Sequence, residues 1–133
     1  MGMPMHVLVV DDEPVIAAVV RRTLRGRCAI DDVGSGEEAL ARIRAGHRYS
    51  LILCDLVMPR MTGLDVLDAM RREAPDQAER FIFVTGGGRT EIEQRRLETS
   101  GVFILWKPFD RTRLLAAVSE YLPTPIEAVG GGS

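Results

Sequence analysis

The chain alternates five short apolar runs with helical segments, and this alternation constrains its fold more than any other feature. The runs lack the polar alternation of half-exposed strands, so they predict buried parallel strands. They cover residues 6–10, 28–33, 50–54, 80–84 and 102–106. Strands that alternate with helices predict a doubly wound α/β fold with a five-stranded parallel sheet. By analogy with flavodoxin-like (βα)5 folds, we expect the strand order 2-1-3-4-5.

The segments between the runs have the spacing of amphipathic helices. Pro14 begins the first of them, at a position where the missing N–H costs nothing. The apolar faces predicted for the first, second, third and last helices comprise Val15, Ile16, Val19, Val20 and Leu24, then Leu40 and Ile43, then Leu67 and Met70, and finally Leu114, Leu115, Val118 and Leu122.

The helix expected after the fourth strand differs from the others. Ile92 and Leu97 are its only large apolar residues, so we expect it to be the least firmly packed helix. Capping-box spacing marks the start of this helix and of the second one, at the pairs Thr90 with Glu93 and Ser35 with Glu38.

Length and charge limit the classes of protein that the chain can belong to. Its 133 residues fit one domain, which we place at residues 5–122, with residues 1–4 and 123–133 as flexible termini or linker. The net charge of −2 provides no basic surface for nucleic acid or anionic membranes. No apolar run is long enough to span a bilayer, and residues 1–6 lack a signal-peptide pattern. We expect a cytoplasmic protein whose two cysteines, Cys28 and Cys54, are buried free thiols.

Polar residues stand at the ends of four of the five predicted strands. Asp11 and Asp12 follow the first strand, Asp55 the third, Thr85 the fourth and Lys107 the fifth. Lys107 is also the only lysine among 17 basic residues. Because the carboxyl ends of parallel strands meet at one edge of the sheet, we expect three carboxylates, a hydroxyl and an ammonium group to converge there.

Such a cluster favours magnesium and phosphoryl chemistry. Three carboxylates repel one another, and a pKa must rise unless a cation intervenes. Magnesium fits because it binds few carboxylates and retains waters and phosphate oxygens. Neither His6 nor His47 stands at this edge, so the candidate nucleophile is a carboxylate and its product an acyl phosphate.

Each of these residues alone has an ordinary structural interpretation. Asp12 is a candidate helix N-cap, Asp55 a candidate Asx-turn, Thr85 a turn residue and Lys107 a solvated surface charge. Five such residues at the ends of the appropriate strands are improbable by chance, so their combination favours a functional site.

Four segments carry a resemblance to a known family: VLVVDDEP, LILCDLVMPRMTGLDVL, FVTGG and WKPF. Together they resemble the receiver domain of bacterial two-component response regulators over about residues 5–122. The resemblance implies that Asp55 is the phosphorylated residue. It also implies that Asp12 binds Mg²⁺ directly, that Asp11 binds it mainly through water, and that the backbone carbonyl of Val57 completes the protein ligands.

The resemblance assigns further roles at the other two strands. Thr85 would move toward the phosphoryl group, Lys107 would pair with it, and the peptide bond before Pro108 would be cis. The phosphoryl donor would be a phosphohistidine of a histidine kinase or of a phosphotransfer protein. Such a domain is a switch that dephosphorylates itself, and not an enzyme acting on other substrates.

The sequence departs from the family pattern at positions that matter for signalling. Ile104 occupies the place of an aromatic switch residue, and Phe103 belongs to the opposite face of the strand. Val57 and Gly87 lack polar groups that could hold a hydrolytic water, so we expect slow self-hydrolysis. Trp106 shares a strand face with Ile104, and this region is our candidate contact for an output protein or a second copy.

The stretch SGVFILWKPF resembles stand-alone receivers or receivers attached to hybrid sensor kinases. After Leu122 the sequence indicates a linker or tail and no output domain, so we expect no direct contact with nucleic acid.

Other function classes fit less well. An aspartate-nucleophile phosphatase would have a second Asp where Val57 stands. A flavodoxin would need a phosphate-binding loop where Asp11 and Asp12 would repel the flavin phosphate. A pseudo-receiver, acting only as a protein-interaction module independent of phosphorylation, is the alternative that the complete set of five site residues disfavours.

Overall fold

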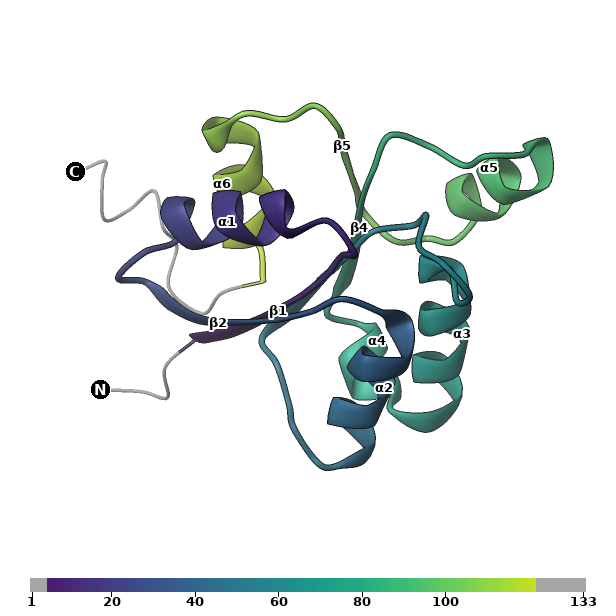
Figure 1. Ribbon diagram of the computed structural model, residues 1–133, viewed down its shortest axis with the longest axis horizontal. Coiled ribbons are helices and arrows are strands. Elements are labelled where there is room, and N and C mark those ends of the chain that lie inside the picture. The colour runs from purple at the N-terminus through teal and green to yellow at the C-terminus, as the bar shows by residue number, and fades with distance from the viewer. Residues whose placement is uncertain (1–4, 122–133) are drawn as a thin grey trace.

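The computed structural model describes residues 5–121, which form a parallel sheet between two layers of helices (Figure 1). The strand order is β2-β1-β3-β4-β5, which confirms the predicted doubly wound topology. The predicted boundary at residue 122 and both predicted termini lie outside the described residues. The strands are β1 (Met5–Val10), β2 (Cys28–Val33), β3 (Leu51–Cys54), β4 (Phe81–Thr85) and β5 (Ile104–Trp106).

The helices are α1 (Pro14–Thr23), α2 (Gly36–Arg44), α3 (Gly63–Glu73), α4 (Pro75–Ala78), α5 (Glu91–Glu98) and α6 (Arg111–Ser119). The short helix α4 was not predicted from the sequence. It begins at Pro75 and places the buried side chain of Gln77 against the backbone of Tyr49, where its amide accepts one hydrogen bond and donates another. No helix among residues 5–121 has the length and apolar character needed to cross a membrane.

Two separate cores lie on the two faces of the sheet. Along β1, Val7 and Val9 pack toward α1 and α6, whereas Leu8 and Val10 pack toward α2 and α3. All four side chains are almost completely buried. A strand buried on both faces has no polar alternation, which explains why the apolar runs predicted the strands well.

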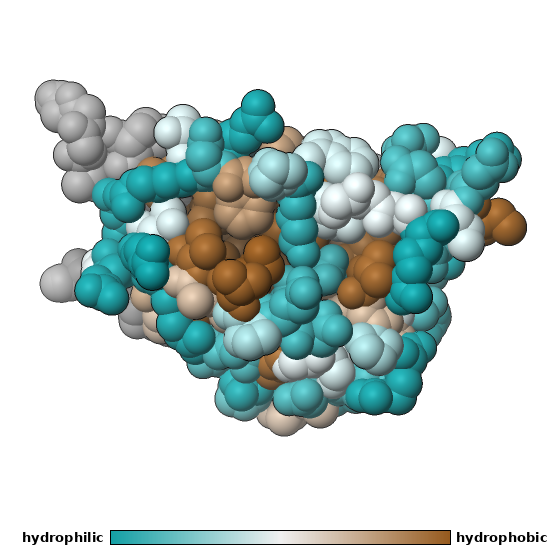
Figure 2. Space-filling view, turned by 45° about the horizontal axis from the view of Figure 1, so that its top comes forward, coloured by the Kyte–Doolittle hydropathy of each residue, from teal (hydrophilic) through white to brown (hydrophobic). Residues whose placement is uncertain are grey.

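The predicted apolar face of α1 is only partly right. Val20 and Leu24 are buried, but Val15 is 60% exposed and Val19 is 36% exposed. The stripe that contacts the sheet contains Ala17 and Val20 and continues into Leu24, a spacing of one helical face. Figure 2 shows hydrophobic side chains exposed on the face of the molecule that carries α1.

The other helix predictions are largely confirmed. The predicted apolar residues of α2 and α3 are buried. Of those predicted for the last helix, Leu114 and Val118 are buried and Leu115 is partly exposed, while Leu122 lies outside the described residues. In α5 only Leu97 is buried, while Ile92 is 73% exposed, so the predicted weak packing of this helix is confirmed. Cys54 is a buried free thiol as expected, whereas Cys28 is only partly buried.

The predicted helix caps form half of the expected bonds. The hydroxyl groups of Ser35 and Thr90 each accept a hydrogen bond from the backbone three residues later. The carboxylate of Glu93, however, accepts a hydrogen bond from the N–H of Arg89 and not from that of Thr90. The strand starts were predicted one or two residues early for β3, β4 and β5. Ser50, Arg80 and Phe103, which directly precede these strands, each form a single backbone hydrogen bond to the neighbouring strand.

Candidate functional site

The carboxyl ends of the central strands bring the predicted site residues to one edge of the sheet. Val10 of β1 pairs in register with Cys54 of β3, so Asp11 and Asp55 follow side by side. The N–H of Asp55 donates to the carbonyl of Val10 at 2.9 Å, which extends the ladder by one residue. The two acidic positions are therefore fixed by backbone pairing and not by flexible loops.

Three carboxylates form a tight group at this edge. Each of Asp11, Asp12 and Asp55 has a carboxylate oxygen within 4.8 Å of the other two. Asp11 and Asp55 are only 7% and 6% exposed, whereas Asp12 lies at the surface. The three acidic residues therefore lie together, as predicted.

Lys107 supplies the positive charge that faces this group. Its Nζ lies 3.7 Å from Oδ2 of Asp11 and 3.7 Å from Oδ2 of Asp55. The backbone N–H of Lys107 donates to the carbonyl of Thr85 at 2.9 Å, which holds the start of the following loop against β4. The peptide bond between Lys107 and Pro108 is cis, as the resemblance implied.

Burial controls the ionisation of the site. The pKa of Asp55 is raised to about 6: loss of solvent contributes most to the rise, the charge of Asp11 adds to it, and Lys107 opposes it. Burial also raises the pKa of Asp11, while the hydrogen bond from the N–H of Glu13 lowers it. Near neutral pH the Asp55 carboxylate is mostly ionised.

The donor set suits a hard divalent cation. Oδ2 of Asp11 is buried and accepts no hydrogen bond within the part of the chain that the structure describes. The carboxylate of Asp12 likewise accepts none from residues 5–121. Carboxylate oxygens with unused acceptor capacity, gathered beside a second buried carboxylate, match the ligands that Mg²⁺ takes in proteins.

Thr85 is placed differently from the other predicted residues. Its side chain is buried, but its hydroxyl accepts a hydrogen bond from the N–H of Gly87 at 3.1 Å and donates to the carbonyl of Gly87 at 3.4 Å. In this structure the hydroxyl is therefore engaged with the β4–α5 loop and not with the carboxylates.

Val57 and Gly63 shape the backbone around Asp55. The N–H of Val57 lies 3.4 Å from Oδ1 of Asp55, which orients the carboxylate. A Cβ atom on Gly63 would lie 2.3 Å from the carbonyl oxygen of Asp55, so only glycine allows α3 to begin so close to it. Sequence reasoning missed this role of Gly63, although its place four residues after Pro59 in a turn-rich loop was a usable signal.

A reciprocal capping box holds the start of α3 beside the site. The hydroxyl of Thr62 accepts from the N–H of Asp65, and the Asp65 carboxylate accepts from the N–H of Thr62. This pair was not predicted from the sequence, because Asp65 stands at the helix position where the predicted capping boxes have Glu. The cap fixes the first turn of α3 next to Asp55.

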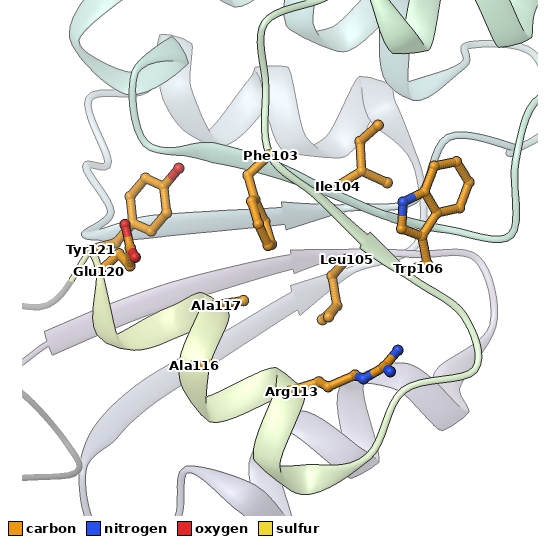
Figure 3. Close-up of a pocket in the computed structure, with 9 residues that line it drawn as sticks. All are labelled: Phe103, Ile104, Leu105, Trp106, Arg113, Ala116, Ala117, Glu120 and Tyr121. Carbon is orange, nitrogen blue, oxygen red and sulfur yellow. The ribbon is translucent and has the colours of Figure 1, made fainter.

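A groove of about 550 Å³ lies beside the site, between β5 and α6 (Figure 3). Leu105 points toward α6, whereas Ile104 and Trp106 point to the other side of β5, which confirms their predicted shared face. Phe103 is 52% exposed and Trp106 is 42% exposed. The edge strand β5 and the residue before it therefore carry two exposed aromatic rings.

The family model of the response regulator receiver domain matches residues 7–119. The chain belongs to this family. The receiver domain match includes all four strand ends that carry the site, and it agrees with the observed strand order.

Individual relatives support the same assignment. The chain is 37% identical to the probable transcriptional regulatory protein TcrX of Mycobacterium tuberculosis, over 81% of this chain and 45% of that protein. It resembles the chemotaxis response regulator CheY4 of Vibrio cholerae, with a TM-score of 0.76 and 27% identity over 90% of this chain and all of the other.

A second structural relative bears on the metal. The response regulator TrrA of Thermotoga maritima, solved in complex with Mg²⁺-BeF, has a TM-score of 0.73 and 29% identity, covering 89% of this chain and 99% of that one. The chain spans about half the length of several curated relatives that it matches. Whether the chain is a stand-alone receiver or one attached to a hybrid sensor kinase stays a prediction from the sequence.

Proposed function

We propose that this receiver domain is a phosphoacceptor switch in which Asp55 accepts a phosphoryl group from a histidine kinase or a histidine phosphotransfer protein. The observation that carries the proposal is the placement of the Asp55 carboxylate, buried between two other carboxylates and the ammonium group of Lys107. This function belongs in the bacterial cytoplasm.

The proposed transfer is a displacement at phosphorus. A carboxylate oxygen of Asp55 forms a bond to the phosphorus atom, and the bond from phosphorus to the donor's imidazole nitrogen breaks. The imidazole then takes a proton from solvent. Lys107 pairs with the phosphoryl oxygens as a point charge, which offsets the charge that the group brings into a buried site.

Asp11, Asp12, Asp55 and the carbonyl of Val57 would hold Mg²⁺. When bound, the ion neutralises carboxylates and orients the phosphoryl group. Oδ1 of Asp11 already accepts a hydrogen bond from the N–H of Glu13, and its Oδ2 faces the ammonium group of Lys107. The carboxylate of Asp12 has neither contact and is more available to the metal. This supports the expectation that Asp12 binds the metal directly and Asp11 mainly through water.

Thr85 would donate its hydroxyl to a phosphoryl oxygen after leaving Gly87. The protein then acts on itself and on no other substrate, and its own hydrolysis of the acyl phosphate is slow. The pseudo-receiver alternative gains no support, because every residue that the chemistry needs stands at the expected strand end.

The output would pass through protein contacts at β5. Trp106 and Ile104 share the strand face next to the β4–α5 loop, and tryptophan is enriched among residues that dominate binding energy. We propose this region as the contact for an output protein or a second copy. Trp106→Ala is expected to weaken that contact by about 2 kcal/mol.

Acetyl phosphate with Mg²⁺ tests the proposed function directly. The intact mass should rise by one phosphoryl group, and Asp55→Asn should abolish the increase. Asp76→Asn, a change at an exposed carboxylate of α4, is the matched control and should leave the modification unchanged. An Asp55→Asn variant that is modified to the same extent as wild type would refute the proposal.

A titration without phosphoryl donor tests the metal. Calorimetry with Mg²⁺ should show weaker binding to Asp12→Ala than to Asp11→Ala, and the strongest binding to wild type. Equal affinities in all three proteins would remove the metal site from the proposal.

A further inference from the structure

The peptide unit between Gly87 and Gly88 is held from two sides. Its carbonyl accepts the hydroxyl of Thr85 at 3.4 Å, and its N–H donates to Oε1 of Gln94 at 2.8 Å. A trans peptide is planar, so its carbonyl and its N–H turn together. Thr85 and Gln94 are therefore coupled through one rigid group.

The side chain of Gln94 is itself fixed on α5. Its Nε2 donates to Oε2 of Glu98, one turn later, at 2.8 Å. The carboxamide thus presents its oxygen to the loop and its nitrogen to the helix. Because Glu98 binds only the nitrogen, the two halves of this arrangement can be separated by mutation.

The loop can approach Gln94 only because it consists of glycines. A Cβ atom on Gly88 would lie 2.6 Å from the backbone nitrogen of Gln94. Gly87 has a φ of +123°, which other residues rarely adopt. A Cβ atom on Gly87 would also lie 3.8 Å from the ring of Trp106, so the indole borders the same peptide.

We infer that Gln94 is a positioning residue. By holding the Gly87–Gly88 peptide, it keeps the Thr85 hydroxyl bonded to the loop and so opposes a hydrogen bond from this hydroxyl to the phosphoryl group. The inference rests on the proposed function. The hydroxyl has one proton, and it cannot donate to Gly87 and to a phosphoryl oxygen at the same time. An acceptor that keeps the Gly87–Gly88 peptide in place stabilises the resting arrangement relative to the phosphorylated one.

Removal of the acceptor should therefore favour the phosphorylated arrangement. Gln94→Met keeps helix propensity and length but lacks the oxygen. We expect it to bind the phosphoryl mimic beryllofluoride, with Mg²⁺, about three- to ten-fold more tightly than wild type, the effect of one hydrogen bond. The measurement is the fluorescence of Trp106, the only tryptophan in the chain.

Three further variants isolate the role of the oxygen. Gln94→Glu retains an acceptor for the N–H of Gly88 and should bind beryllofluoride no more tightly than wild type. Glu98→Ala removes only the bond to the nitrogen and should also match wild type. In a Thr85→Val background, Gln94→Met should have no effect, because no hydroxyl remains to be released.

The outcomes separate this inference from the proposed function. A wild-type protein that binds beryllofluoride, together with an unchanged affinity in Gln94→Met, would overturn the inference alone. Equal tightening by Glu98→Ala, or persistent tightening in the Thr85→Val background, would also overturn it. A wild-type protein that binds no beryllofluoride would overturn both. As a check that does not need the ligand, the amide proton resonance of Gly88 should shift in Gln94→Met and stay in place in Glu98→Ala.

Discussion

The helices α3 and α5 follow the two strands that carry Asp55 and Thr85, yet they are held very differently. Helix α3 begins in contact with the carbonyl of Asp55 and has six buried residues in its first eight positions: Gly63, Leu64, Val66, Leu67, Ala69 and Met70. Helix α5 buries only Leu97, and its start is connected to β4 by a run of three glycines.

The difference matches what the roles proposed for the two residues require. A nucleophile needs a fixed position relative to its metal ligands and to Lys107, since small displacements slow the reaction. A switching hydroxyl needs a surrounding that can rearrange at low cost, and such regions have few buried apolar contacts. The molecule therefore combines a firmly packed side around Asp55 with an adaptable side around Thr85.

Substitution of one glycine on each side tests this contrast most strongly. Gly63→Ala should destabilise the protein by about 3 kcal/mol or more, because its Cβ would collide with the backbone of Asp55 and Leu56. Gly86→Ala meets no atom within 4 Å and should change stability by less than about 0.5 kcal/mol. Urea denaturation measures both, and similar losses in the two variants would contradict the contrast.

The buried charge of Asp55 should itself cost stability. Its pKa of about 6 in the folded state exceeds the unfolded value of about 3.9, so the folded protein binds more protons between these values. Stability therefore falls as pH rises from about 4 to about 6, and the full cost of about 2–3 kcal/mol is present at pH 7.

The variant Asp55→Asn should remove this cost in metal-free buffer. At pH 7 we expect it to be more stable than wild type by about 2–3 kcal/mol, and below about pH 4 the two should converge. Urea denaturation with a chelator measures the difference, and added Mg²⁺ should narrow it by stabilising wild type. A difference that does not change with pH would show that the charge is not its origin.

The lifetime of the phosphorylated form tests the side around Asp55. Val57→Asn should shorten it by about ten-fold, because the amide can position a water that valine cannot. A second change at Gly87 is unsuitable, since the φ of +123° strains any side chain there. Val57→Leu is the apolar control and should leave the lifetime unchanged. Mass spectrometry over time measures the decay of the phosphorylated form in wild type and in both variants. Equal lifetimes in wild type and Val57→Asn would reject the role of position 57.

The smallest effect is expected at Ile92, an exposed apolar residue of α5. Ile92→Ser should change the free energy of unfolding by less than about 0.5 kcal/mol, because its side chain is 73% exposed. The corresponding change inside α3, Met70→Ser, should cost several kcal/mol, since that side chain is fully buried. Equal effects would show that α5 contributes as much to the core as α3 does.

The sequence by itself determined the strands of the sheet and the residues at its functional edge, whereas the strand order came from the analogy with flavodoxin-like folds. Strands buried on both faces are continuous apolar runs, and the points where Asp11, Asp55 and Lys107 interrupt them are visible without coordinates. Parallel topology then brings those points together whatever the details of packing are.

Only the tertiary structure decided which side of each helix faces the sheet and how the site is held. Val15 and Gln94 have ordinary helical positions in the sequence, but one is exposed and the other caps a loop. The contact of Gly63 with Asp55 and the raised pKa of that carboxylate also depend on atoms brought together by packing. Local patterns record the periodicity of an element, whereas contacts and burial depend on its rotation and distance relative to segments far away in the chain.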